Sequence, residues 1–187
     1  MLKSRFEWTI LLVMATLLGT AWIVFSQEDM RRVSAPKSLT EAPIVGHLAP
    51  DFTLETPVGE SINLQEVLAA NGAAGQPVVL NFWASWCGPC RVEMPNFQRA
   101  SMRYNGRVAF LGINQGEDAP TITNFGNQFN LTYPLLVDQD SAVNRLYNVR
   151  GLPTTVFVDG DGVVREVVVG IISQAVLEDR IQGMLTE

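Results

Sequence analysis

The sequence predicts an α/β domain in which helices flank a mixed central sheet. Two observations lead to this prediction. Segments typical of buried strands alternate with segments that can form helices, and two strand-like segments near the C-terminus are joined by a tight turn. The 187 residues suit one domain with short appendages, and a chain with 47% hydrophobic and 17% charged residues is not disordered.

An uncharged apolar run at residues 8–25 precedes this domain. As a helix it would be about 27 Å long, close to the hydrocarbon thickness of a bilayer. Trp8 and Trp22 lie near its ends, and Lys3 and Arg5 precede it, which favours a cytoplasmic N-terminus. We expect an uncleaved transmembrane anchor. A cleaved signal peptide stays open as the alternative, although the run is long for one.

The chain divides into three predicted parts. Residues 1–27 form the cytoplasmic N-terminus and the anchor. Residues 28–43 are polar, contain Pro36 and Pro43, and are predicted to be a linker. Residues 44–187 form the folded domain, which we expect on the extracytoplasmic side of the cell membrane.

The domain begins with a predicted β-hairpin. Polar and apolar residues alternate at 51–55 and again at 60–64, and residues 56–59 have the composition of a turn. Asn63 can then cap a short helix that ends near Ala70.

The central strands and the longest helix follow. Residues 78–82 are nearly all apolar, as expected of a strand that is covered on both faces. A helix is predicted from the cysteines to about Tyr104, and we expect Pro95 to kink or divide it. Residues 107–114 supply a second buried strand.

The last third of the chain continues the alternation. In chain order, we expect a helix at 120–129, a strand at 135–137, a helix at 141–147, strands at 154–158 and 163–169, and a helix from 174 to about 184. Asp159–Gly162 is a strong hairpin signal between the two last strands. Ser173 can cap the final helix.

The chain has two cysteines, Cys87 and Cys90, and one histidine, His47. Two cysteines cannot build a disulfide-rich scaffold, and together with one histidine they cannot complete a four-ligand zinc site. We therefore predict no metal site and interpret the pair as a redox-active dithiol.

The spacing gives the two sulfurs different roles. Cys87 follows a buried strand and would stand at the first turn of a helix, where unpaired N–H groups stabilise the attacking thiolate. Cys90 lies one turn later on the same side, so it can resolve a mixed disulfide. Gly88 and Pro89 let the chain enter the helix tightly.

The run Asn81–Cys90 resembles the active site of the thioredoxin superfamily. The resemblance covers about residues 44–187 and is nearest to the TlpA/ResA-like membrane-anchored thiol-disulfide oxidoreductases, which have a redoxin (AhpC/TSA-like) domain. The other matching stretches are Ala49–Leu54, Arg91–Pro95 and Gly151–Thr155. The resemblance implies a thioredoxin fold with an N-terminal hairpin extension and a central insertion, for which residues 117–134 are the candidate.

The resemblance also implies a docking site for substrate. Pro153 would be a cis-proline that faces the cysteines, and the backbone beside it at Leu152 would pair with an extended substrate strand. An ordinary proline at the start of a strand is the alternative. Trp86, Gly88 and Pro89 would complete the docking surface.

Asn81 and Glu93 are further candidates beside the cysteines. Thioredoxin has a buried aspartate at the position of Asn81, and an asparagine cannot ionise. Glu93 lies three residues beyond Cys90 on the same helical face, where the family has a glutamate implicated in tuning the cysteines. We expect a raised pKa for Glu93 and a proton-relay role, with a solvated surface glutamate as the alternative.

These features predict a protein disulfide oxidoreductase without a cofactor. By resemblance, it would reduce disulfides in secreted proteins or apocytochrome c, and a transmembrane thiol carrier of the CcdA/DsbD type would supply electrons. A net oxidant is the alternative. A peroxidase is a weaker enzyme alternative. A copper chaperone fits poorly because no histidine follows the cysteines, and a redox-silent interaction module is the remaining non-enzyme alternative. A net charge of −6 without a basic run excludes nucleic-acid binding.

Overall fold

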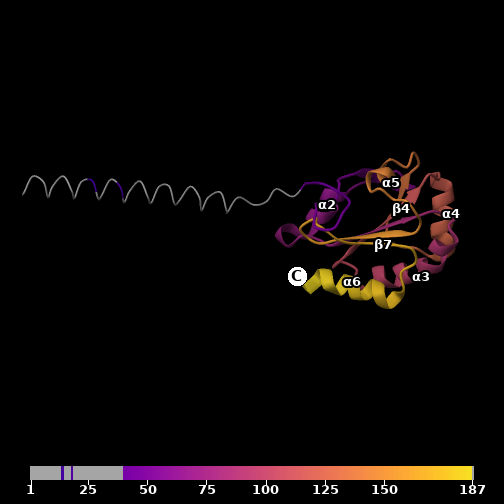
Figure 1. The fold of residues 1–187 in the computed structure, drawn as a ribbon. Helices are drawn as coiled ribbons and strands as arrows, with labels where there is room; N and C mark the ends of the chain where they lie inside the picture. The colour runs from indigo at the N-terminus through magenta and orange to yellow at the C-terminus, as the bar shows by residue number, and fades with distance from the viewer. Residues whose placement is uncertain (1–13, 15–17, 19–39, 187) are drawn as a thin grey trace, which may run out of the picture. The chain divides into compact units, whose positions relative to one another are not determined.

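The computed structural model describes Met14, Leu18 and residues 40–186 of the chain (Figure 1). Apart from Met14 and Leu18, the predicted anchor at residues 8–25 lies outside the described residues. Within the part that is described, no helix is long and apolar enough to cross a membrane. One compact unit begins at Leu39, a few residues before the predicted boundary at Ile44.

A single mixed sheet forms the centre of this unit. Its strand order is β2-β1-β5-β4-β3-β6-β7. The strands β3, β4 and β5 run parallel, whereas the other pairings are antiparallel. The bounds are β1 Thr53–Glu55, β2 Ser61–Asn63, β3 Val78–Trp83, β4 Ala109–Gln115, β5 Leu135–Asp138, β6 Thr154–Val158 and β7 Val164–Val169. The predicted α/β class and both hairpins are confirmed.

Helices cover both faces of the sheet. They are α2 Leu64–Leu68, the short 3₁₀ helix η1 Ala69–Ala74, α3 Gly88–Arg103, α4 Ala119–Phe129, α5 Ala142–Leu146 and α6 Gln174–Thr186. Side chains of α3, α4 and α6 pack into one core, and side chains of α2 and α5 pack into the other. Figure 1 shows α3 and α6 on the opposite side of β7 from α2 and α5.

The central strand β3 is buried along its whole length because helices cover both of its faces. Its side chains alternate between the two cores. Val79 and Trp83 face the core of α3, whereas Val78, Leu80 and Phe82 face the core of α2 and α5. Asn81 lies two residues after Val79 in the same strand, so its side chain is on the same face of the sheet and points toward α3.

The helix α3 continues through Pro95, so the expected division at this proline does not occur. Pro95 cannot donate to the carbonyl of Arg91, which is four residues earlier. The proline is exposed, and water can satisfy that carbonyl. Met94 and Phe97 are fully buried on the inner face of α3, and this packing stabilises the helix on both sides of the proline.

The segment 117–134, which we interpreted as an insertion, contains α4 and the turn that leads into β5. β5 pairs with β4 on one side and with β1 on the other. The N-terminal hairpin therefore joins the sheet through the strand that follows this segment.

Candidate active site

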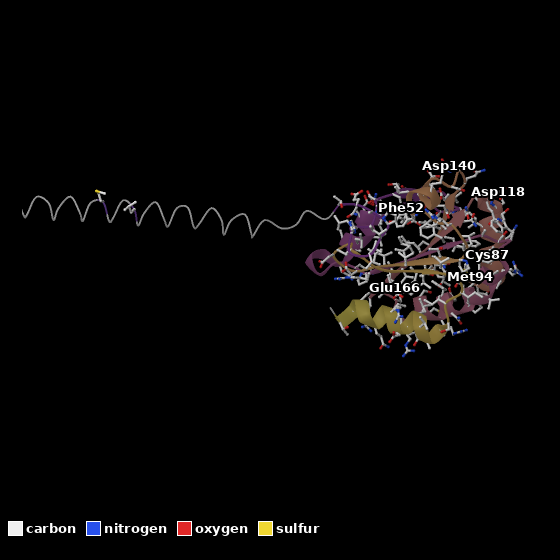
Figure 2. All side chains as sticks on the ribbon, in the orientation of Figure 1. Phe52, Cys87, Met94, Asp118, Asp140 and Glu166 are labelled. Atoms are coloured by element: carbon white, nitrogen blue, oxygen red, sulfur yellow. A yellow bond between two sulfur atoms is a disulfide. The ribbon has the colours of Figure 1, made fainter. Side chains whose placement is uncertain are left out.

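The two cysteines lie where β3 ends and α3 begins, at the C-terminal edge of the parallel strands. Cys87 is the N-cap residue of α3, and its sulfur accepts a hydrogen bond from the N–H of Cys90 at 3.1 Å. The two residues form a disulfide. Figure 2 labels Cys87 near Met94, a residue of α3.

The two sulfurs differ in access. Cys87 is 5% exposed, whereas Cys90 is fully buried. Once the disulfide is reduced, a sulfur at a helix N-cap receives backbone N–H groups that favour its thiolate. Cys87 is therefore the more accessible of the two cysteines and lies at the helix N-cap, as was predicted for the attacking thiol, and Cys90 is fully buried.

A groove of about 530 Å³ opens beside Cys87. Trp86 forms part of its wall and is 68% exposed, which is unusual for a tryptophan. The residues that line the groove are Trp86, Cys87, Gly88 and Pro89 from the cysteine segment, and Gln115, Val149, Arg150, Gly151 and Leu152 from the segments opposite. The fold thus brings together the predicted docking residues from two distant parts of the sequence.

Pro153 is buried and follows Leu152, which lines this groove. The peptide bond between Leu152 and Pro153 is cis, the isomer that the resemblance implied. The carbonyl of Pro153 accepts a hydrogen bond from Gly170 N–H at 2.8 Å, so this carbonyl already has a partner within the protein. The residues just before Pro153, Gly151 and Leu152, line the groove.

Glu93 lies beneath the cysteines with no exposed surface, so it is not a solvated surface residue. One carboxylate oxygen accepts from Asn81 Nδ2 at 2.9 Å, and the other accepts from the N–H of Ile172 at 3.1 Å. Burial raises the pKa of Glu93 to about 7, against these two hydrogen bonds, which lower it. The carboxyl group can therefore gain or lose a proton near neutral pH.

Neutral polar groups surround Glu93. Asn81 Nδ2 also lies 3.5 Å from Thr155 Oγ1, and Asn81 Oδ1 is buried without a partner among the described residues. Tyr133 is buried nearby, and its hydroxyl donates to Met94 Sδ at 3.3 Å. Burial and the charge of Glu93 both raise the pKa of Tyr133, which stays neutral. Both donors to the Glu93 carboxylate are neutral, so hydrogen bonding is what stabilises its charge.

Sequence reasoning missed the contact between Glu117 and the loop before Cys87. Its carboxylate accepts hydrogen bonds from Ser85, which lies two residues before Cys87, and from Asn114 in β4. One sequence signal could have indicated this contact. Glu117 follows the end of β4, and the carboxyl ends of neighbouring parallel strands meet at one edge of a sheet.

The chain matches the family model described as the AhpC/TSA family over residues 45–167. It is 31% identical to the thioredoxin-like protein YneN of Bacillus subtilis over 179 residues, which cover 94% of this chain and 96% of YneN. It is 33% identical to the thiol-disulfide oxidoreductase ResA of Geobacillus kaustophilus over 144 residues, which cover 76% of this chain and 79% of ResA.

A solved structure has a similar fold. The structure of a putative thiol:disulfide interchange protein DsbE from Chlorobium tepidum aligns with a TM-score of 0.68 and 30% identity. The alignment covers 76% of this chain and 98% of the other. The thioredoxin-like arrangement of the sheet and its flanking helices is thereby confirmed.

Proposed function

Because this chain belongs to the AhpC/TSA family and is a thiol-disulfide oxidoreductase of the ResA/DsbE type, we propose that it reduces disulfide bonds in proteins outside the cytoplasm. One observation carries the proposal. A more accessible Cys87 at a helix N-cap borders a substrate-sized groove, while Cys90 and an acid with a pKa of about 7 lie buried behind it. The substrates we propose are secreted proteins, including the haem-binding cysteines of apocytochrome c.

The reaction begins with the reduced dithiol. The Cys87 thiolate attacks one sulfur of a substrate disulfide, so a mixed disulfide forms and the departing substrate sulfur takes up a proton. Cys90 then loses its proton, and its sulfur attacks Cys87 Sγ. The second substrate thiol leaves, two electrons have passed to the substrate, and the enzyme holds the Cys87–Cys90 disulfide seen in the structure.

Glu93 is the proposed acceptor of the Cys90 proton. It lies three residues beyond Cys90 on the same face of α3, and both side chains are fully buried. A base whose pKa is near the operating pH is suited to proton transfer. Asn81 cannot ionise, but its amide holds the carboxylate of Glu93 in place.

The groove is the proposed docking site. An extended substrate segment can lie along the backbone of Gly151 and Leu152 and bring its disulfide to Cys87, a form of strand addition. The indole ring of Trp86 supplies a large exposed apolar surface at the rim. Such a site recognises backbone shape more than sequence, which suits an enzyme with several substrates.

The sequence of the N-terminal segment supports a proposed location and a proposed electron source. We propose that residues 8–25 anchor the chain in the cell membrane, with the catalytic domain on the extracytoplasmic side. A tether of this kind raises the local concentration of the dithiol near a transmembrane thiol carrier of the CcdA/DsbD type. That carrier would reduce the Cys87–Cys90 disulfide after each cycle.

Trapping tests the proposed substrates. The variant Cys90→Ser should accumulate mixed disulfides on Cys87, and mass spectrometry of the trapped partners should identify extracytoplasmic proteins with cysteine pairs. The double variant Cys87→Ser, Cys90→Ser is the matched control and should trap none. Recovery of cytoplasmic proteins alone would contradict the proposed location.

The reduction potential tests the direction. We expect a reduction potential below about −220 mV, toward the value of about −270 mV for thioredoxin. We also expect the reduced protein to cleave insulin disulfides, and Cys87→Ser to lose this activity. A potential near −120 mV, the value of a strong periplasmic oxidant, would favour the net oxidant instead.

A further inference from the structure

Ser85 occupies the loop between β3 and Cys87, and charged side chains bind all of its polar groups. Glu117 accepts from the Ser85 N–H at 2.7 Å through one oxygen, and from the Ser85 hydroxyl through the other. Arg91 Nη1 donates to the Ser85 carbonyl at 3.4 Å. Hydrogen bonds to charged groups are stronger than neutral ones, so this loop is held firmly.

Both charged residues are themselves fixed by their surroundings. Asn114, a fully buried residue of β4, donates to the Glu117 carboxylate at 2.7 Å and accepts from the Glu117 N–H at 3.1 Å. The guanidinium of Arg91 lies over the rings of Phe125 and Phe129, at 5.5 and 5.1 Å from their centroids. Its second nitrogen donates to Gln128 at 3.0 Å.

These contacts connect the cysteine loop to α4. Glu117 immediately precedes Asp118, the N-cap of α4, and the partners of Arg91 lie along the rest of that helix. We propose that Glu117 and Arg91 are positioning residues, which place the loop of Ser85, and hence Cys87 and Trp86, at the rim of the groove for attack on protein disulfides.

This inference rests on the proposed exchange of disulfides with protein substrates, and it separates two kinds of reactivity. A protein disulfide must dock in the groove before it can meet Cys87, so its reaction depends on where the loop holds the sulfur. Iodoacetamide is small and needs only an accessible thiolate. A change in loop position should therefore slow the first reaction more than the second.

The test compares Glu117→Gln with Glu66→Gln. Glu66 is an exposed residue of α2, so the control removes an equal charge away from the loop. We expect Glu117→Gln to lower the rate constant for insulin reduction about tenfold, while the rate of Cys87 alkylation at saturating pH changes less than about twofold. The control should change neither rate, and both variants should still unfold cooperatively, which shows that the fold is kept.

Ser85→Ala provides a second, milder variant because it removes only the hydroxyl. We expect a smaller loss of insulin reduction than in Glu117→Gln, and the double variant should be no slower than Glu117→Gln alone. Arg91→Met should show the same selective loss, because it removes the donor to the Ser85 carbonyl.

Three results would overturn the proposal. They are an equal loss in the insulin and iodoacetamide reactions, additive losses in the double variant, or a change confined to the pH midpoint of alkylation. The last result would mean that Glu117 acts on the Cys87 pKa through its charge. If wild type itself failed to reduce insulin, the proposed function would fail instead.

Discussion

At the scale of single residues, the site depends on how a buried carboxyl group is accommodated. Glu93 has no exposed surface, and an ionised carboxylate in such a place needs hydrogen bonds to replace water. Asn81 and the N–H of Ile172 supply one bond to each oxygen. Because neither donor is charged, the protonated and ionised forms are close in free energy at neutral pH, as a proton relay requires.

Glu93→Gln should change the titration of the thiols in the reduced protein. An ionised carboxylate about one helical turn from Cys90 disfavours a second negative charge, so its removal should lower the apparent pKa of Cys90 by about one to two units. Titration of both thiols by absorbance or NMR measures this change. Equal thiol pKa values in Glu93→Gln and Glu66→Gln would exclude the relay role.

The same residue should make stability depend on pH in the oxidised protein. The pKa of Glu93 is about 7 in the folded state and about 4.5 in the unfolded state, so the folded state binds more protons between these values. The free energy of unfolding should therefore fall as pH rises from 4.5 to 7, by up to about 3 kcal/mol. Urea unfolding of wild type and of Glu93→Gln at each pH measures how the free energies of unfolding of the two proteins differ. This difference should not change with pH above pH 8.

Some of this site could be predicted from the sequence because its members share one helix. The helical period places Cys87, Cys90 and Glu93 within reach of one another without knowledge of the fold. The contact between Asn81 and Glu93 needs the packing of α3 on β3, which no local pattern contains. Ser85 and Glu117 are 32 positions apart, and they meet only because β3 and β4 end at the same edge of the sheet.

At the scale of elements, local signals predicted the ends of helices better than their interiors. Asn63, Asp118 and Ser173 each cap a helix through a side-chain oxygen, as short polar residues do. Pro95 predicted a kink or a division of α3, and the division does not occur because the buried inner face of that helix outweighs the lost hydrogen bond. Gly112 shows a further limit, since a Cβ there would lie 2.8 Å from Leu135 Cδ2, a close approach that sequence cannot reveal.

The junction between the N-terminal hairpin and α2 offers a test at this scale. Asn63 Oδ1 accepts from Glu66 N–H at 3.0 Å, and Asn63 Nδ2 donates to both oxygens of Asp51 at 3.1 and 3.2 Å. Asn63→Ala should lower the free energy of unfolding by about 1–2 kcal/mol, because the cap and the tie to Asp51 are lost together. Urea unfolding measures the loss.

The control for this junction is Asn105→Ala, which changes an exposed asparagine after α3 and should alter stability by less than about 0.5 kcal/mol. Thiol exchange should be unchanged in both variants, since the hairpin lies far along the sheet from β3. If Asn63→Ala is fully folded in the assay but exchanges thiols more slowly, the hairpin contributes to the active site.

At the scale of the whole molecule, the described residues of both hydrophobic cores come from one part of the chain. The buried residues of the two cores lie between Ala49 and Met184. The segment before them is also tied to the domain, because Leu48 N–H donates to the carbonyl of Thr40 at 3.3 Å and Gly46 N–H donates to the carbonyl of Val164 at 2.8 Å. A cut that preserves these contacts must therefore fall before Thr40.

A variant that lacks residues 1–39 should keep the fold and the chemistry but lose the proposed anchor. We expect its melting temperature and its rate of insulin reduction to match those of the full chain, because no described core residue has been removed. In cell fractionation the full chain should sediment with membranes, whereas the truncated chain should not, since the apolar run at 8–25 is gone. Membrane sedimentation of the truncated protein would place the attachment in the domain itself, and loss of its cooperative unfolding would show that residues 1–39 contribute to the fold.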